Sequence, residues 1–386
     1  MSKRGFDVSR RGGFRRVLRT VHLWIGLIVG VPLVVVCLSG SALVWHDALE
    51  DWMHPERRPS SQGDAVLPPS HYLGAAAKVL GEGLLPSTLR MPAEAGAPVV
   101  VSALDRLDGR VRFTAVWLDP ATGRVLDSAD QGASLFGFLH RLHGSLAVPQ
   151  FAGRQIVGWI GVVLLVAAVS GLWLWWPRRE VGLAALGWRR GLKVSANIHH
   201  VGGVWIALPL IVVTVTGIYI SFPQTSRAVM GAFMTMPPQQ QRIPFGRALE
   251  QPARGADEVV AGVLEQMPDG RLTVLSLPQE SRPSWSVQVR TVGGAAETAQ
   301  FSVEDATGRI NRTDGAAAGG DEVSRLMRRI HDAQGMGPVW ETLVFLTGVL
   351  PAAFAVTGVM MWLRRRGNRR KLDMQRQAVR LASRSS

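Results

Sequence analysis

Four histidines lie at repeating positions in this chain. His22 opens an apolar run that continues with a glycine, a proline and a Ser-Gly pair, and His199 opens a second run of the same kind at a constant separation of 177 residues (199 − 22 and 217 − 40). His143 and His331 form another pair, since each comes two residues after an arginine and leads to a Ser-Gly or Thr-Gly pair and a tryptophan. Imidazole is the commonest metal ligand. Two symmetric pairs of histidines therefore predict bound metal, and we expect haem iron.

The pairing predicts two haem sites, which we name by their histidines: the first pair (His22 and His199) and the second pair (His143 and His331). If a twofold axis along the membrane normal relates the two halves of the chain, the two histidines of each pair face each other at the same membrane depth. Two imidazoles on one iron make a bis-histidine b-type haem. All four are therefore candidate axial ligands of two b-type haems. His200 and His140 remain open as alternative ligands, because one adjoins His199 and the other precedes His143 by one helical turn.

Four long apolar runs carry or follow these histidines. Each is long enough to cross a hydrocarbon core of about 30 Å as a helix that rises 1.5 Å per residue. The sequence thus predicts an integral membrane protein with four spanning helices, at roughly 21–45, 154–176, 198–222 and 338–363.

Basic residues are concentrated in the short soluble segments and give the chain a formal net charge of +14. Short loops rich in Lys and Arg stay on the cytoplasmic side, so both termini are predicted to be cytoplasmic in a bacterial inner membrane. The run Arg364-Arg365-Arg366 directly follows the last span, where it indicates topology and contact with anionic lipid. The interpretation therefore includes membrane lipid as a partner and no nucleic acid. Cys37 is the only cysteine, which excludes a disulfide framework.

Two long soluble segments, 46–139 and 223–330, separate the paired spans, and the topology puts them in the periplasm. Each predicts a helix, short alternating strands and a turn, and the turn glycines Gly123 and Gly308 are 185 residues apart (308 − 123). The predicted fold class is a four-helix transmembrane bundle, all-α in the membrane, with two small periplasmic α+β modules. An internal duplication gives it pseudo-twofold symmetry along the membrane normal.

The expected segments follow from these spans, with both ends (1–18 and 367–386) expected to be disordered. The first half comprises a cytoplasmic basic arm (1–20), span 1 (21–45), periplasmic module 1 (46–139), and an outer interfacial helix with span 2 (140–176). A cytoplasmic loop (177–197) leads to the second half, which comprises span 3 (198–222), periplasmic module 2 (223–330), an outer segment with span 4 (331–363), and a cytoplasmic basic tail (364–386).

Several segments resemble one known family, the PepSY-associated transmembrane proteins, over nearly the whole chain. The motifs are His22-Leu-Trp-Ile-Gly, His140-Arg-Leu-His-Gly, Ser170-Gly-Leu-Trp-Leu-Trp-Trp-Pro-Arg-Arg, His199-His-Val-Gly-Gly-Val-Trp and Thr357-Gly-Val-Met-Met-Trp-Leu-Arg-Arg, with the Asp-x-x-Thr-Gly turns. The resemblance implies that the soluble modules are PepSY-like. Family members include ferric-siderophore reductases, so it also implies reduction of a periplasmic ferric siderophore, Fe(III) to Fe(II), by electrons from the cytoplasmic side.

Other functions remain open at this stage. The chain has no Gly-x-Gly-x-x-Gly after a strand and no Walker loop, so the electron donor is expected to be external: a cytoplasmic protein, a quinol, or a reduced flavin or nicotinamide. One alternative is a non-redox membrane protein whose modules bind a partner or inhibit a peptidase. Another is a quinol-linked cytochrome or a cupric reductase.

Four arginines are candidate partners of haem propionates: Arg19, Arg141, Arg328 and Arg329.

Overall fold

The computed structural model describes residues 3–60, 67–81, 83–107, 110–176, 186–188, 193–233, 247–291, 298–313 and 322–382 of the 386-residue chain. The chain divides into two compact units. One, the helical unit, comprises 1–44, 139–233 and 324–386; the other, the sheet unit, comprises 45–138 and 234–323.

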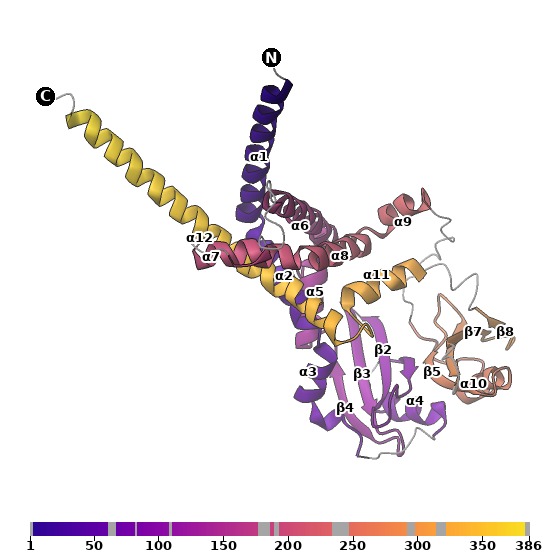
Figure 1. The fold of residues 1–386 in the computed structure, drawn as a ribbon. Helices are drawn as coiled ribbons and strands as arrows, with labels where there is room; N and C mark the ends of the chain where they lie inside the picture. Colours follow the sequence, from indigo (N-terminus) through magenta and orange to yellow (C-terminus); the bar gives the residue numbers. More distant parts are fainter. Residues whose placement is uncertain are drawn as a thin grey trace. The chain divides into compact units, whose positions relative to one another are not determined.

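The helical unit contains all four histidines of the two pairs, and its helices are labelled in Figure 1. Within it, α6 packs against α8, and α12 packs against α2. Its elements, with α5 and α11 continuing into it from the sheet unit, are α1 (Lys3–Ile28), α2 (Gly30–Leu43), α5 (Leu135–Ser145), η2 (Pro149–Phe151), α6 (Gly153–Trp175), α7 (Val194–Asn197), the π-helical turn η4 (Ile198–Gly202), α8 (Gly203–Ser221), α9 (Pro223–Gly231), α11 (Glu322–Asp332) and α12 (Pro338–Ala382).

Three helical stretches of the described chain are long and apolar enough to cross a membrane: Gly153–Trp175, Val194–Ser221 and Pro338–Gln377. A fourth span is present if the bent pair Gly13–Ile28 and Gly30–Leu43 counts as one. The prediction of an apolar helical membrane protein is therefore confirmed, with three or four spans.

The predicted first span, 21–45, is not one straight helix. α1 and α2 meet at Val29 with a bend of 67°. Pro32 favours the bend, because it has no N–H to donate to the carbonyl of Ile28 and its ring crowds that carbonyl. Pro209 in α8 and Pro351 in α12 lie inside helices that continue through them.

The basic ends of the chain are helical where the structure describes them, so the expectation of disorder at 367–386 is wrong up to Ala382. α12 continues well past the predicted end of the last span, and α1 begins at Lys3. Extending an existing helix costs far less than starting one. The Arg, Lys, Gln, Met, Leu and Ala residues that follow the span are also good helix formers.

The sheet unit holds one antiparallel sheet of eight strands in the order β4-β3-β2-β1-β5-β6-β7-β8. Helices α4 and α10 confirm the two helices predicted at 71–80 and 257–265. The elements are α3 (His46–Met53), η1 (Pro55–Arg57), α4 (Pro69–Ala77), β1 (Pro86–Arg90), β2 (Val99–Leu107), β3 (Arg110–Leu118), β4 (Val125–Asp130), α10 (Ala256–Glu265), β5 (Gly270–Ser276), β6 (Ser284–Thr291), β7 (Thr298–Glu304) and β8 (Ile310–Arg312).

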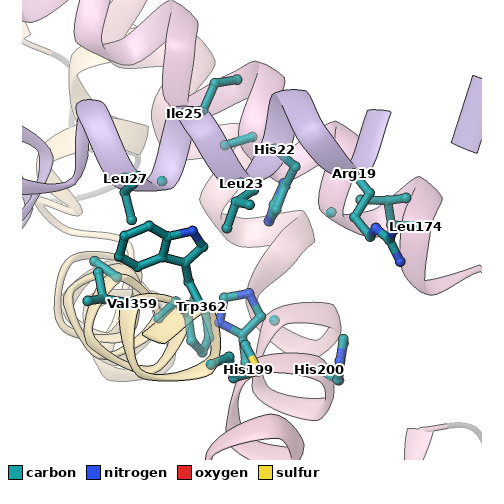
Figure 2. Close-up of a pocket in the computed structure, with 18 of the residues that line it drawn as sticks. Arg19, His22, Leu23, Ile25, Leu27, Leu174, His199, His200, Val359 and Trp362 are labelled. Atoms are coloured by element: carbon teal, nitrogen blue, oxygen red, sulfur yellow. The ribbon is translucent and has the colours of Figure 1, made fainter. Parts of the chain in front are cut away.

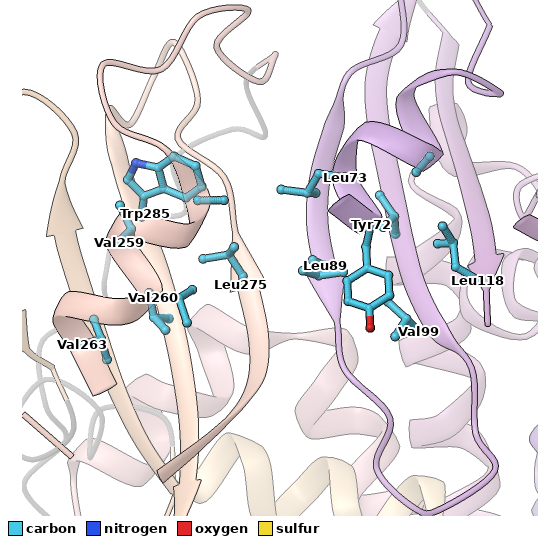
Figure 3. Close-up of a cluster of buried hydrophobic side chains, with 14 of the residues drawn as sticks. Tyr72, Leu73, Leu89, Val99, Leu118, Val259, Val260, Val263, Leu275 and Trp285 are labelled. Atoms are coloured by element: carbon cyan, nitrogen blue, oxygen red, sulfur yellow. The ribbon is translucent and has the colours of Figure 1, made fainter. Parts of the chain in front are cut away.

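The two predicted modules join edge to edge, which the sequence did not indicate. β1 pairs with β5, and Leu89 lies opposite Leu275 at the seam, both fully buried. Tyr72 of α4 and Val263 of α10 belong to the same apolar cluster (Figure 3). One core therefore serves both halves, and the strand order reads the same outward from the β1–β5 seam on either side.

Candidate metal centres

The first pair of histidines meets inside the helical unit. His22 comes from α1 and His199 from the turn η4, and their ring centroids are 6.3 Å apart. Figure 2 shows the two side chains reaching toward one another, with the Trp362 indole of α12 beside them. The planes of the two imidazoles are nearly perpendicular, at 88°. The predicted first pair is thus brought together by the fold.

The second pair meets in the same way. His143 on α5 and His331 on α11 have ring centroids 5.9 Å apart, with an interplanar angle of 38°. Both helices lie outside the spanning segments. Burial lowers the pKa of His143 to about 4 and also lowers the pKa of His331. Both imidazoles are therefore neutral at pH 7, which is the form that binds a metal.

In the first pair, the Nδ1 atom of each ring contacts a hydroxyl group. The Nδ1 of His22 lies 3.0 Å from Ser170 Oγ, and the Nδ1 of His199 lies 3.2 Å from Thr357 Oγ1. Each hydroxyl donates its only hydrogen to a carbonyl of its own helix, so it accepts from the imidazole. The hydrogen of each ring is therefore on Nδ1, and the lone pair on Nε2 is available to a metal.

The second pair has the same arrangement with backbone acceptors. The Nδ1 of His143 donates to Val36 O at 2.8 Å, and the Nδ1 of His331 donates to Val213 O at 2.9 Å. Metal-binding histidines almost always donate their second N–H in this manner, which fixes the ring and its tautomer. All four histidines are thus held in the form that presents Nε2.

Each Ser-Gly or Thr-Gly pair faces one histidine, as the sequence predicts. A Cβ built on Gly40 would lie 2.6 Å from His143 Cε1, and one on Gly217 would lie 2.9 Å from His331 Cε1. The corresponding distances are 3.1 Å from Gly171 to His22 and 3.7 Å from Gly358 to His199. The first two distances leave no room for a side chain. Glycine at positions 40 and 217 therefore lets the imidazoles of the second pair lie directly against neighbouring helices.

Short helices and left-handed linkers carry the second pair. α5 ends at Ser145, and Leu146, Ala147 and Ala152 have positive φ before α6 begins. Ala333, fully buried, has φ of 61° between α11 and α12. Left-handed backbone costs a non-glycine residue about 1–2 kcal/mol, so tertiary contacts must hold these linkers. They set the histidine helices apart from the spans, as the sequence predicts for these segments.

The structure separates His199 and His143 from the two alternatives. η4 is a π-helical turn at His199 and His200, a feature frequent at functional sites. His200 lines the same cavity but is exposed, while His199 contacts Thr357. His140 is exposed on α5. The rings of His199 and His200 are themselves 6.0 Å apart, so the repeat and the hydroxyl contact favour His199, and the ring distance does not.

A cavity of about 1300 Å³ surrounds the first pair. This exceeds the roughly 300–1,000 Å³ of usual ligand pockets, so a macrocycle has room. The indole Nε1–H of Trp175, which lines the cavity, is buried without a hydrogen-bond partner and could donate to an acidic group of a ligand. Two imidazoles that bound one first-row metal ion from opposite sides, at about 2.0–2.1 Å, would have their ring centroids roughly 6 Å apart. Both histidine pairs have this spacing, and the residues around the first pair, together with its cavity, fit a bis-histidine haem.

Of the four arginines predicted as propionate partners, one lines the cavity and three do not. Arg19 lines the cavity, whereas Arg141, Arg328 and Arg329 are exposed on α5 and α11. His46 contacts Asp47, and His71 packs against Gly123.

A further possible metal cluster lies in the sheet unit. Among the described residues, His54, Glu56 and Asp127 are the one group of three potential ligands close enough to share an ion. Arg57 pairs with Asp127 at 2.7 Å, so an ion-pair network explains this cluster.

One family model matches most of the chain. The PepSY-associated TM region matches residues 19–365. The chain belongs to the PepSY-associated transmembrane family. The match begins shortly before His22 and ends shortly after Trp362, so all four histidines lie inside the family region. A search of curated proteins gives no match.

Membership of the PepSY-associated transmembrane family establishes a membrane protein of that class. The sequence could not indicate the Nδ1 acceptors Val36 and Val213, because any residue type offers a backbone carbonyl. The Ser and Thr acceptors were visible only as part of the small-residue pairs.

Proposed function

We propose that this PepSY-associated transmembrane protein is a two-haem electron conduit that reduces a periplasmic ferric siderophore. The observation that carries the proposal is the state of the four histidines: two facing pairs, each ring held through Nδ1 with Nε2 presented. A bound b-type haem supplies one-electron redox chemistry. The chain contributes ligation by His22 and His199 at one site and by His143 and His331 at the other.

The proposed orientation puts both termini in the cytoplasm and the sheet unit in the periplasm of a bacterial inner membrane. The basic residues at both ends support this orientation. The duplication with pseudo-twofold symmetry is part of the proposal, and the palindromic strand order and the equivalent histidine contacts support it. The first pair would then lie toward the donor side and the second pair toward the acceptor side.

The acceptor is assigned by resemblance. Among family members, the motifs of this chain resemble those of the ferric-siderophore reductase FoxB. One electron converts bound iron(III) to iron(II), which the siderophore holds weakly and releases. Membrane lipid is the other expected partner. The contact residues for the siderophore stay unassigned.

The test is a haem count on the detergent-purified protein. We expect the pyridine haemochrome spectrum to give about two b-type haems per chain, and we expect a ferric siderophore to reoxidise the dithionite-reduced protein. Parallel assays with cupric ion and a quinone rank the alternative acceptors. A protein without haem would reject the conduit and favour a binding role for the soluble modules.

A further inference from the structure

The cavity at the first pair extends beyond the histidines, along two helices. On α1 it is lined at helical spacing by Arg15, Arg19, His22 and Gly26. Residues three and four apart share one face of a helix, so one stripe of α1 runs from the glycine to the arginines. Arg15 lies seven residues before His22, which corresponds to about 10 Å of helix. The arginines therefore form a separate end of the cavity.

α12 contributes a matching stripe. Gly358, Trp362, Arg366, Arg369 and Asp373 line the cavity in the same order, with the glycine near the histidines and the charges at the far end. Among the residues that the structure describes, seven arginines and one acidic residue, Asp373, line the cavity. The arginines are Arg15, Arg16, Arg19, Arg365, Arg366, Arg369 and Arg370. One b-type haem carries two carboxylates, so seven guanidinium groups point to a further anionic ligand.

Aromatic and apolar side chains form the walls between the arginines and the histidines. Leu174, Trp175, Met361 and Trp362 all line this part of the cavity. The guanidinium of Arg366 lies over the Trp362 ring at 5.4 Å. These walls suit a flat aromatic body, and arginine forks suit phosphate, which they bind through paired charge-assisted hydrogen bonds.

We infer that this arginine-rich end binds a flat aromatic reductant that carries a phosphate, of the reduced flavin mononucleotide class, and that this molecule is the electron donor. The inference rests on the proposed function. A concave, lined site suits a small molecule. A quinol has no phosphate for the arginines. A nicotinamide delivers hydride, for which two histidine-held haems offer no acceptor, whereas a flavin gives up its electrons singly.

The electrons balance with the proposed reaction. One anionic reduced flavin loses two electrons and one proton to become oxidised flavin. Two iron(III)–siderophore complexes each gain one electron and become iron(II) complexes. The proton is released on the flavin side, and no further reactant is needed.

The test uses oxidised flavin mononucleotide and riboflavin, which differ only in the phosphate. Binding to the full-length protein in phosphatidylcholine nanodiscs is measured by the quenching of flavin fluorescence. We expect the mononucleotide to bind at least about tenfold more tightly than riboflavin. Added salt should weaken the binding of the mononucleotide and leave the binding of riboflavin unchanged. Equal affinities, or no salt effect, would overturn the inference. Haem content is measured separately, so failure of the proposed function is seen independently.

Two double variants on α12 test whether the arginines that line the cavity bind the phosphate. Arg366→Gln with Arg369→Gln should remove the preference for the phosphate. Lys371→Gln with Arg376→Gln loses the same charge from the same helix outside the cavity lining and should keep the preference. If both double variants behave alike, the preference comes from net charge and the site is wrong. Nanodiscs with phosphatidylglycerol provide a second arm: displacement of the mononucleotide there would assign the arginines to lipid headgroups and overturn the flavin site.

Discussion

At the scale of single residues, the helical unit treats its four repeated histidines alike. Each donates Nδ1–H to an oxygen on a neighbouring helix and lies against a small residue of that helix. Histidines outside the repeat are held differently: His54 contacts Glu56 at 2.9 Å, and His140 is exposed. The common support, more than the residue type, distinguishes candidate ligands from the other histidines.

His331→Ala tests the second site. The substitution removes one of two facing imidazoles, so we expect the haem count to fall from about two to about one per chain, because a bis-histidine site needs both ligands. His140→Ala is the matched control, since His140 is exposed beside the same site. A haem count by pyridine haemochrome distinguishes them. Loss of haem from the His140 variant instead would make His140 the ligand.

Gly40→Ala tests the close approach of the second site to α2. The new Cβ would lie 2.6 Å from His143 Cε1, so the ring must move, at a cost of about 1–3 kcal/mol in a packed interior. We expect weaker haem retention and a lower melting temperature. Gly358→Ala should be tolerated, because its nearest ring atom is 3.7 Å away. Equal melting temperatures and haem contents in the two variants would contradict this packing.

At the scale of elements, the linkers between histidine helices and spans position the second pair. Gly153 begins α6 where a Cβ would lie 2.1 Å from Ser145 O and 2.7 Å from Val148 O. Both are backbone atoms, which cannot swing away as a side chain can. The linker before α6 therefore depends on glycine at this position.

Gly153→Ala should open that linker and displace α5. We expect loss of the haem at the second pair with retention at the first, measured as haem per chain and by the spectrum of the remaining haem. Gly144→Ala, within α5 itself, is the control, since nothing lies within 4 Å of its added Cβ. If Gly153→Ala keeps both haems, the linker does not position His143.

The sequence predicts elements well where the signal is local. Apolar length predicts the spans, and the constant offset predicts which histidines meet, because equivalent residues of two similar halves occupy equivalent places. The bend at Val29 was readable from Pro32, yet Pro209 occupies the equivalent position in a helix that continues. Tertiary packing decides between these outcomes. The β1–β5 seam had no signal at all, because pairing between distant strands depends on register and not on composition.

At the scale of the whole molecule, the sheet unit has one shared apolar core, and a tyrosine is buried in it. The Tyr72 hydroxyl donates to Pro120 O, and the side chain is fully buried. Burial raises the pKa of this phenol. A phenol with a raised pKa in the folded state adds stability below its ordinary pKa of about 10 and loses it as pH rises through the folded pKa.

Alkaline titration should therefore unfold the sheet unit as Tyr72 ionises. The chain has two tyrosines, so Tyr219→Phe leaves Tyr72 as the only phenol. In that variant we expect tyrosinate absorbance to appear above pH 10, together with loss of β-sheet circular dichroism. Ionisation near pH 10 with the sheet intact would show that the phenol is accessible in the folded state.

The supports of the histidines have a consequence for biosynthesis. His22 is held by Ser170 and His143 by Val36, all from the first half of the chain; His199 is held by Thr357 and His331 by Val213, all from the second. Facing partners, however, always come from opposite halves. The ribosome can thus deliver a first half whose imidazoles are already oriented before their mates are translated. If the proposed haem is captured between them, it would fasten the newly made half to the older one, and haem supply would then control the last step of assembly.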